Sequence, residues 1–273
     1  MDILIALLAA IIVFALGGSI GSFVNVVAYR LPVGLSILWP PSRCPHCLHQ
    51  LGKWENVPVL GWLRLRGRCH YCKNEISIRY PVVEAATGIL FLLFFWVFGV
   101  SIQTLGYWTF CSWLIALSLI DLDTMTLPNP LTQSGLITGL LFELVTGFLA
   151  KANWTGAFYQ LMSGIVGAVM GLWLFDLIAM VGSITLGQPA MGGGDAKLAA
   201  MLGAWLGWKY LLLASFLACA VGAFVGGGMI ALGWRERRQP MPFGPFLALG
   251  AVMTLFEGEV ILSTYLRFMF PAI

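Results

Sequence analysis

The stretch that decides the fold, residues 3–27, reads ILIALLAAIIVFALGGSIGSFVNVV. It carries no charged side chain and exceeds the roughly 20 apolar residues that cross a bilayer. The 273-residue chain is 59% hydrophobic and only 10% charged, whereas a soluble domain carries about 25% charged residues. No basic segment precedes the stretch, so we expect a retained first span rather than a signal peptide. The composition therefore predicts an all-α polytopic membrane protein.

Seven further apolar stretches follow and bring the expected number of transmembrane helices to about eight. The third and sixth of the eight are short for a bilayer crossing. The seven stretches are Val82–Val100, Tyr107–Ile120, Leu131–Ala150, Phe158–Ile184, Ala196–Trp208, Tyr210–Trp234 and Phe243–Phe268.

Basic residues are concentrated between the first two spans, and this fixes the expected orientation. The positive-inside rule places residues 28–81 in the cytoplasm and the N-terminus outside. Counting spans then puts a second cluster, Arg235, Arg237 and Arg238, on the cytoplasmic side, together with Asp121 and Asp195. Eight of the 15 Lys and Arg lie in the first segment: Arg30, Arg43, Lys53, Arg64, Arg66, Arg68, Lys73 and Arg79.

The same segment contains two Cys-x-x-Cys pairs, Cys44/Cys47 and Cys69/Cys72. Four thiolates at this spacing are typical of a structural zinc site, because they complete a tetrahedron and leave no open position for catalysis. A redox pair or disulfides are the alternative, and a reducing cytoplasm argues against them. Other candidate ligands are the loop histidines His46, His49 and His70; Cys111 and Cys219 lie in apolar spans, where we expect buried packing.

Two acids lie at the mouths of apolar spans: Asp121 in IDLDTMTLPN and Asp195 in GGGDAKL. A carboxylate in a membrane costs about 2.5–3.5 kcal/mol on insertion scales, so such groups usually serve a function. The alternative for Asp121 and its neighbour Asp123 is a pair of solvated acids at a helix end. The alternative for Asp195 is an N-cap.

The glycines Gly192, Gly193 and Gly194 before Asp195 favour a site for a peptide. They carry no side chains and permit positive φ, so another backbone can approach the acid closely. A flexible hinge is the competing interpretation. If Asp121 and Asp195 meet, they form the proton-sharing pair of an aspartyl hydrolase: one carboxylate activates water, and the protonated one stabilises the oxyanion.

The chain resembles the type IV prepilin peptidases, which are bifunctional leader peptidase/N-methyltransferases of the GxGD aspartyl class. The resemblance rests on residues 21–32 (GSFVNVVAYRLP), the two cysteine pairs, residues 78–84 (IRYPVVE), the Asp121 motif ending in Leu127-Pro128-Asn129, and residues 192–198 (GGGDAKL). The family often has Asp where this chain has Asn129. No dinucleotide-binding glycine loop is present, so the cofactor-binding residues are unknown; Glu84, Asn25 and Arg30 are candidates for the methyltransferase half or for tying the loop to the membrane.

The resemblance implies an enzyme with eight spans in the bacterial inner (plasma) membrane. It would cut prepilins or pseudopilins on the cytoplasmic face, after the glycine that ends a basic leader, using Asp121 and Asp195. It would then methylate the new N-terminus with S-adenosylmethionine. Its expected partners are these substrates and membrane lipids, with no nucleic acid. The expected domains are a first transmembrane helix (1–27), a zinc-binding loop domain (28–81) and a membrane-embedded peptidase domain (82–273).

Two other functions compete with this one. A proton-coupled transporter would use membrane carboxylates, but it would place acids near mid-span and show paired half-repeats. A membrane-tethered zinc adaptor without catalysis would leave both acid motifs unexplained. Glu143 and Asp176 also lie within apolar spans and have no assigned role.

Overall fold

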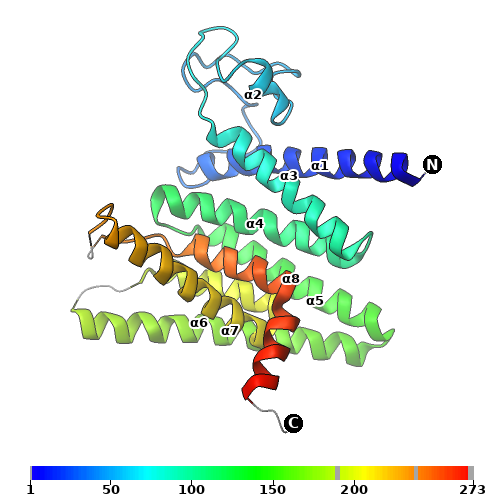
Figure 1. The fold of residues 1–273 in the computed structure, drawn as a ribbon, viewed down its shortest axis with the longest axis vertical. Helices are drawn as coiled ribbons and strands as arrows, with labels where there is room; N and C mark the ends of the chain where they lie inside the picture. Colours follow the sequence, from blue (N-terminus) through cyan, green and yellow to red (C-terminus); the bar gives the residue numbers. More distant parts are fainter. Residues whose placement is uncertain (1, 188–190, 237–238, 270–273) are drawn as a thin grey trace. The chain divides into compact units, whose positions relative to one another are not determined.

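The computed structural model describes residues 2–187, 191–236 and 239–269, and within these ranges the chain is all-helical (Figure 1). Seven of its helices are long and apolar enough to cross a membrane, and the eighth, α2, is a short helix in the loop after α1. The all-α membrane fold predicted from composition is thus confirmed. The helices are α1 (Asp2–Arg30), α2 (Leu60–Arg64), α3 (Arg79–Phe98), α4 (Ile102–Thr124), α5 (Asn129–Lys151), α6 (Trp154–Leu186), α7 (Gly193–Ala231) and α8 (Gly244–Met269).

The long helix α7 explains why seven helices replace the eight expected spans. It has 39 residues, and a straight helix of that length would measure about 58 Å, almost twice the hydrocarbon core. The backbone breaks at Gly207, where φ is 70° and ψ is 170°. The sixth and seventh expected spans, Ala196–Trp208 and Tyr210–Trp234, correspond to the two sides of this break.

Contacts at the ends of α7 show that the chain crosses and returns. Gly194, at its start, lies against Leu127 after α4, and Gly244, at the start of α8, lies against Asp121 near the end of α4. The chain between Gly194 and Gly244 therefore leaves one end of the bundle and comes back to it. The second half of α7 then runs antiparallel to α8, with Tyr210 against Gly258.

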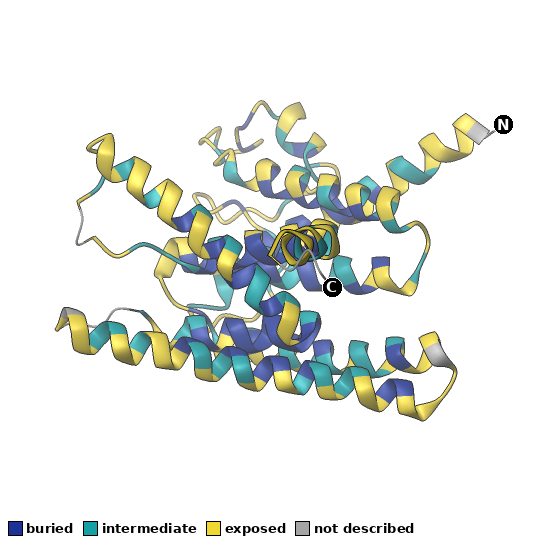
Figure 2. Cartoon of the chain, turned by 60° about the horizontal axis from the view of Figure 1, so that its bottom comes forward, coloured by how far each residue is buried: buried dark blue, intermediate teal, exposed yellow. Residues whose placement is uncertain are grey.

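The described chain forms two compact units, Met1–Ala116 and Leu117–Ile273. In the first unit, α1 and α3 pack through small residues: a Cβ added to Gly17 would lie 2.8 Å from the Cα of Gly88. Such contacts let membrane helices approach closely, which is how they gain packing energy in lipid. The outer face of α1 is apolar and exposed, as expected for a surface that faces lipid (Figure 2).

In the second unit, the first half of α7 is buried between α5 and α6. A Cβ added to Gly203 would overlap the backbone of Gly167, so α6 and α7 touch at their main chains. The indole of Trp205 donates to the carbonyl of Gly135 over 2.8 Å, which ties α7 to α5. This packing fixes the N-terminus of α7, where Asp195 lies.

The second basic cluster can be assessed only in part. Arg235 follows α7 in the described chain, whereas Arg237 and Arg238 lie outside the described residues. The orientation inferred from these charges therefore stays a prediction.

Candidate carboxylate site and metal centre

Asp121 lies in the last turn of α4, because this helix continues to Thr124 rather than ending at Ile120. Only 5% of Asp121 is exposed, and its Oδ2 accepts a hydrogen bond from the backbone N–H of Gly244 over 2.8 Å. The interpretation of Asp121 as a solvated helix-end acid is therefore wrong. Asp123, two residues on, is exposed, as the helical rotation between the two positions requires.

Gly244 is a site residue that the sequence analysis missed. A Cβ at this position would lie 2.7 Å from Oδ2 of Asp121, so a side chain cannot be added without moving the carboxylate. Gly244 is also the first residue of α8, and the N-terminus of a helix carries partial positive charge. The signal available in the sequence was the Gly244-Pro245 pair opening an apolar stretch, since proline is common at the first helical positions.

Asp195 lies in the first turn of α7, after the N-cap residue Gly192. The N-cap interpretation of Asp195 is therefore wrong. Its half-buried carboxyl group lies within electrostatic range of Asp121. The structure thus places both acids at one end of the second unit, with Asp195 at the N-terminus of α7 and Asp121 at that of α8.

The glycines before Asp195 differ from one another in their surroundings. A Cβ on Gly193 would meet nothing within 4 Å, whereas one on Gly194 would lie 3.1 Å from the Cβ of Leu127. None of Gly192, Gly193 and Gly194 has a positive φ. The run is therefore not required for left-handed backbone; it leaves open space at Gly193 and allows a close approach at Gly194.

A polar contact links the helices on either side of the carboxylates. The Nζ of Lys197, two residues after Asp195, donates to Oδ1 of Asn129 over 2.7 Å. Asn129 is the first residue of α5. Asn129, where this chain departs from the family pattern, therefore accepts the hydrogen bond from Lys197 of α7.

The four loop cysteines form one cluster. The Sγ atoms of Cys44, Cys47, Cys69 and Cys72 all lie within 4.8 Å of one another. The Cys44–Cys72 pair is separated by 3.8 Å and the Cys47–Cys69 pair by 3.9 Å. A Zn–S bond of about 2.3 Å gives tetrahedral S–S edges of about 3.8 Å, so the four thiols fit zinc in number, type and spacing.

The cluster is built from two copies of one short turn, Arg43–Gln50 and Arg68–Glu75, in agreement with the two turns expected around the cysteine pairs. In each copy the amide of the first cysteine donates over 2.9 Å to a carbonyl five residues later, His49 in one and Asn74 in the other. Each copy closes with an antiparallel bridge between its end residues. The signal in the sequence was the pair of Arg-Cys-x-x-Cys runs at equivalent positions.

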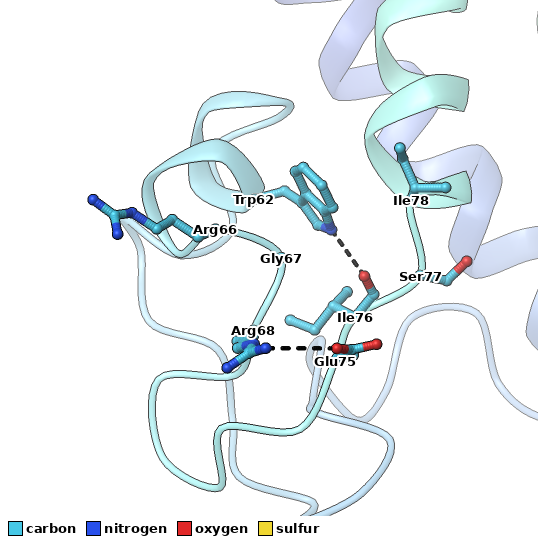
Figure 3. Close-up of a pocket in the computed structure, with 8 residues that line it drawn as sticks. All are labelled: Trp62, Arg66, Gly67, Arg68, Glu75, Ile76, Ser77 and Ile78. Atoms are coloured by element: carbon cyan, nitrogen blue, oxygen red, sulfur yellow. Dashed lines mark hydrogen bonds and ion pairs between the residues drawn. The ribbon is translucent and has the colours of Figure 1, made fainter.

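The residues around the second turn hold it against α2 (Figure 3). The indole of Trp62 donates to the carbonyl of Ile76 over 3.0 Å, and Arg68 pairs with Glu75 at 3.7 Å. Gly67 has a φ of 70°, and a Cβ there would lie 2.7 Å from the Trp62 ring. This packing supports the turn from outside the cysteine cluster.

The loop histidines His49 and His70 contact an aromatic ring, and the cysteines differ in burial and pKa. His49 and His70 pack against the ring of Tyr71, with centroids 3.5 and 5.2 Å away. Backbone N–H donation from Cys72 lowers the pKa of the Cys69 thiol to about 7, whereas burial and the neighbouring thiols raise the pKa of Cys72 to about 11, so the clustered thiols do not ionise alike. Cys111 is buried as predicted, whereas Cys219 is exposed on α7, so its expected burial is wrong.

Of the three candidates for the methyltransferase half, Asn25 joins α1 to α3, and Arg30 and Glu84 connect the loop to these helices. Asn25 donates to the carbonyl of Tyr80 over 3.2 Å, and Arg30 donates to that of Ser36 over 3.1 Å. The buried carboxylate of Glu84 accepts from the amide of Val59 over 2.6 Å. Of the two unassigned acids, Glu143 is half-buried in α5 and Asp176 is exposed on α6.

The fold and site define a class: a helical membrane protein with a carboxylate pair at helix ends and a four-cysteine cluster in a loop. Residues 15–98 match the bacterial peptidase A24 N-terminal domain, and residues 108–227 match the type IV leader peptidase family. No solved structure matches the chain.

Proteins similar to this chain over nearly its whole length are named prepilin leader peptidase/N-methyltransferase. One from Stutzerimonas stutzeri is 39% identical over 93% of this chain and 92% of its own length. Another from Aeromonas hydrophila is 38% identical over 93% of both chains, and one from Pseudomonas aeruginosa is 38% identical over 93% and 92%. The chain therefore belongs to the prepilin leader peptidase/N-methyltransferase family, as its motifs indicated.

Proposed function

We propose that this protein is an aspartyl endopeptidase that removes the basic leader of prepilins or pseudopilins after a glycine and then methylates the new N-terminus. The observation that supports the peptidase proposal is the placement of two acids from distant helices at one end of the second unit, with Asp121 held by Gly244 and Asp195 within range of its charge. Such a pair is what proton-sharing hydrolysis of a peptide bond needs. The family's name agrees with both activities.

Cleavage would proceed by general acid–base catalysis. Two carboxylates a few ångströms apart do not both ionise easily, so one of Asp121 and Asp195 holds a proton. The ionised acid takes a proton from a water, whose oxygen attacks the scissile carbonyl. The protonated acid donates to the developing oxyanion, and the leaving amine receives a proton as the C–N bond breaks.

The helix ends around the acids support this chemistry. The N-termini of α7 and α8 direct partial positive charge towards Asp195 and Asp121, which offsets part of the repulsion between the two groups. The open space beside Gly193 leaves room for the backbone of an extended substrate. We assign Gly192, Gly193 and Gly194 to the substrate-binding backbone on this basis.

The four cysteines would hold a structural Zn²⁺. With four thiolate ligands the ion has no open position, so it contributes to folding and not to cleavage. The loop has one short helix and two paired turns in place of a core of its own. We therefore treat residues 28–81 as a metal-dependent domain between the first helix (1–27) and the peptidase domain (82–273).

The second activity would use S-adenosylmethionine. When bound, it supplies a methyl group to the lone pair of the new N-terminal amine, the C–S electron pair stays on sulfur, and the amine loses a proton. No dinucleotide-type glycine loop is present in the chain, so this donor would need a different kind of pocket.

The proposed location is the bacterial inner membrane, with the zinc loop and both acids on the cytoplasmic side. Support comes from the seven candidate spans and from the excess of Lys and Arg between α1 and α3. A prepilin presents a basic leader in the cytoplasm and an apolar helix in the bilayer. Its scissile bond would then lie at the interface where α4, α7 and α8 place the carboxylates. The comparisons give no support to a proton-coupled transporter.

The test is cleavage of a prepilin by the wild type beside Asp121→Asn and Asp195→Asn. Each variant keeps the shape of the side chain and removes its ability to ionise, so leader removal should fall to background. Asp176→Asn is the matched control, because that acid is exposed on α6. Near-wild-type cleavage by Asp121→Asn or Asp195→Asn, in protein with wild-type thermal stability, would refute the assignment of these two acids as catalytic.

A further inference from the structure

The loop between α1 and α3 is not confined to the ends of these helices, because one of its segments reaches back along α1. Pro58 packs on Gly18, where an added Cβ would lie 3.3 Å from the Cβ of the proline. The next residue, Val59, donates its amide to the buried carboxylate of Glu84 in α3 over 2.6 Å. Figure 1 accordingly shows α2 alongside α1 and not beyond its end. We call residues 56–63 the α2 segment.

The length of α3 fixes where the membrane surface lies in this unit. The helix has 20 residues, and 20 helical residues measure about 30 Å, the thickness of the hydrocarbon core. Beyond Glu84 it carries no charged side chain until it ends at Phe98. The helix therefore uses nearly its whole length to cross, which places Arg79 at the membrane surface on the loop side.

The packing of α1 on α3 then gives the depth of the α2 segment. The two helices run antiparallel, since an added Cβ on Gly21 would meet Glu84 and one on Gly17 would meet Gly88. Gly18 therefore lies level with residues 84–88 of α3. At 1.5 Å per residue, the proline packed on it is about 8–13 Å from the start of α3. A typical helix tilt of about 20° shortens this depth by only about a tenth.

The α2 segment has the composition that this depth requires. Its sequence is NVPVLGWL, without a charged side chain, although the surrounding loop is strongly basic. Leu60 is 64% exposed and Leu63 is 55% exposed, so both project from the surface of the described protein. Charged residues flank the segment at Lys53 and Arg64, and side chains of this length can extend to the headgroups while their stems stay in apolar surroundings.

The backbone of the α2 segment is also suited to lipid. Irregular backbone does not enter the hydrocarbon region unless its polar groups are paired within the protein. Most amides between residues 59 and 67 have such partners, and the indole of Trp62 donates to the carbonyl of Ile76 over 3.0 Å. The paired amides are those of Val59, Leu60, Gly61, Leu63, Leu65, Arg66 and Gly67. The segment therefore needs little water to satisfy its hydrogen bonds.

We propose that the α2 segment is inserted among the acyl chains of the leaflet on the loop side and anchors the loop in the membrane. Leu60 and Leu63 contact lipid, whereas the charged cysteine turns remain in water. Interfacial helices bury their apolar face about 5–10 Å into the boundary between headgroups and acyl chains, a range that overlaps the depth set by α3. The proposal requires only that α1 and α3 cross the membrane, and it does not depend on prepilin cleavage.

Lipid is favoured over a protein partner because lipid-facing surface already lies at this depth. Leu16 on α1 and Ile89 on α3 are next to the glycines through which the two helices pack, and they are 45% and 53% exposed. Exposed apolar side chains in a membrane-spanning helix face acyl chains. The α2 segment packs on α1 beside this surface, so the same acyl chains are within its reach.

The experiment measures the depth of single positions in the full-length protein, with one copy in each phosphatidylcholine nanodisc. Acridonylalanine is incorporated at Leu60 or Leu63 and quenched either by lipids with a doxyl group near the top of the acyl chain or by aqueous iodide. Ile12, exposed on α1, is the lipid standard, and Asn74, exposed in the second cysteine turn, is the water standard. Doxyl quenching at both leucines should lie within about twofold of that at Ile12, and iodide quenching should be about fivefold weaker than at Asn74.

A charge within the α2 segment should move it out of the lipid. With the fluorophore at Leu63, Leu60→Asp should lower doxyl quenching by about threefold or more and raise iodide quenching, because a carboxylate is costly in the hydrocarbon region. Leu48→Asp is the matched control, since Leu48 is 68% exposed but lies in the first cysteine turn, outside the α2 segment. Its fluorophore at Leu63 should be quenched as in the wild type.

The alternatives give different patterns of quenching. Iodide quenching at Leu60 and Leu63 as strong as at Asn74, in protein with wild-type thermal stability, would place the α2 segment in water and overturn the proposal. Protection from both quenchers would mean that protein covers the segment, which would also exclude lipid as the occupant. Should Leu60→Asp fail to fold, the fluorophores in the otherwise unchanged chain decide. A failure of the proposed peptidase activity would leave these readings unaltered, so the two proposals can be refuted separately.

Discussion

The metal centre and the carboxylate site are assembled in opposite ways. The candidate metal centre takes its four cysteines from two short turns of one loop, and each turn is closed by hydrogen bonds within eight residues. The carboxylate site takes its groups from the end of α4 and the starts of α7 and α8, more than a hundred residues apart in the case of Asp121 and Gly244. A local site depends on its ligands, whereas an assembled site depends on the packing that brings its groups together.

This difference predicts that metal removal has the largest effect and that the effect stays local. Cys44→Ser with Cys72→Ser should abolish zinc binding, which can supply about 10 kcal/mol or more of folding free energy to a small domain. Atomic absorption should fall from one zinc per chain to none, and limited proteolysis should cut within residues 31–78. The substitutions leave both aspartates in place.

The control for metal removal is Cys111→Ser, a cysteine outside the cluster. It should keep the zinc and resist proteolysis in the loop. A wild-type protein that contains no metal yet has a protease-resistant loop would contradict the zinc assignment.

The assembled site should be most sensitive at Gly244. Gly244→Ala places a methyl group 2.7 Å from Oδ2 of Asp121, so the carboxylate must move and lose its hydrogen bond. We expect prepilin cleavage to fall by about a hundredfold, because displacements of about 1 Å at a reacting group have effects of that size. Steady-state cleavage assays measure it, and most of the loss should appear in kcat rather than KM.

The control for Gly244 is Gly227→Ala. Gly227 is a helical glycine whose added Cβ would meet nothing within 4 Å, so the substitution should be neutral or slightly stabilising. Equal activity in Gly244→Ala and Gly227→Ala would show that the Asp121–Gly244 contact does not position the carboxylate.

The glycines before Asp195 offer a smaller and more discriminating comparison. Gly194→Ala would bring a methyl group to 3.1 Å from Leu127, whereas Gly193→Ala would place one in open space. Gly194→Ala should therefore shift the start of α7 and reduce kcat by about tenfold. Gly193→Ala should leave kcat unchanged and raise KM, because its methyl group would occupy space proposed for substrate. The opposite pattern would exclude this use of the glycines.

The two sites also differ in how far the sequence predicts them. The cysteine spacing alone predicted which four side chains cluster, because a tetrahedral site in one loop is a short-range property. The parity of the spans placed Asp121 and Asp195 on one side, and the contacts Asp121–Gly244 and Gly194–Leu127 lie at one end of the second unit, in agreement with that prediction. Gly244 could not be identified in this way, since its role depends on where α8 begins relative to α4. The backbone break at Gly207 separates the two expected spans without an intervening loop, and no hydrophobic count would show so short a connection.

The smallest predicted effect concerns Asn129, where this chain departs from the pattern of the prepilin peptidases. Asn129→Asp would turn the 2.7 Å hydrogen bond from Lys197 into an ion pair. Both residues are exposed, so the pair should add at most about 1 kcal/mol to the free energy of unfolding and raise Tm by about 2–4 °C. A double-mutant cycle with Lys197→Met isolates this gain, which should vanish in about 1 M salt. Cleavage should change by less than about threefold, because the buried contacts of Asp121 and Trp205 already fix the ends of α4 and α7. A large change in cleavage with no change in Tm would mean instead that Lys197 acts on the carboxylates directly.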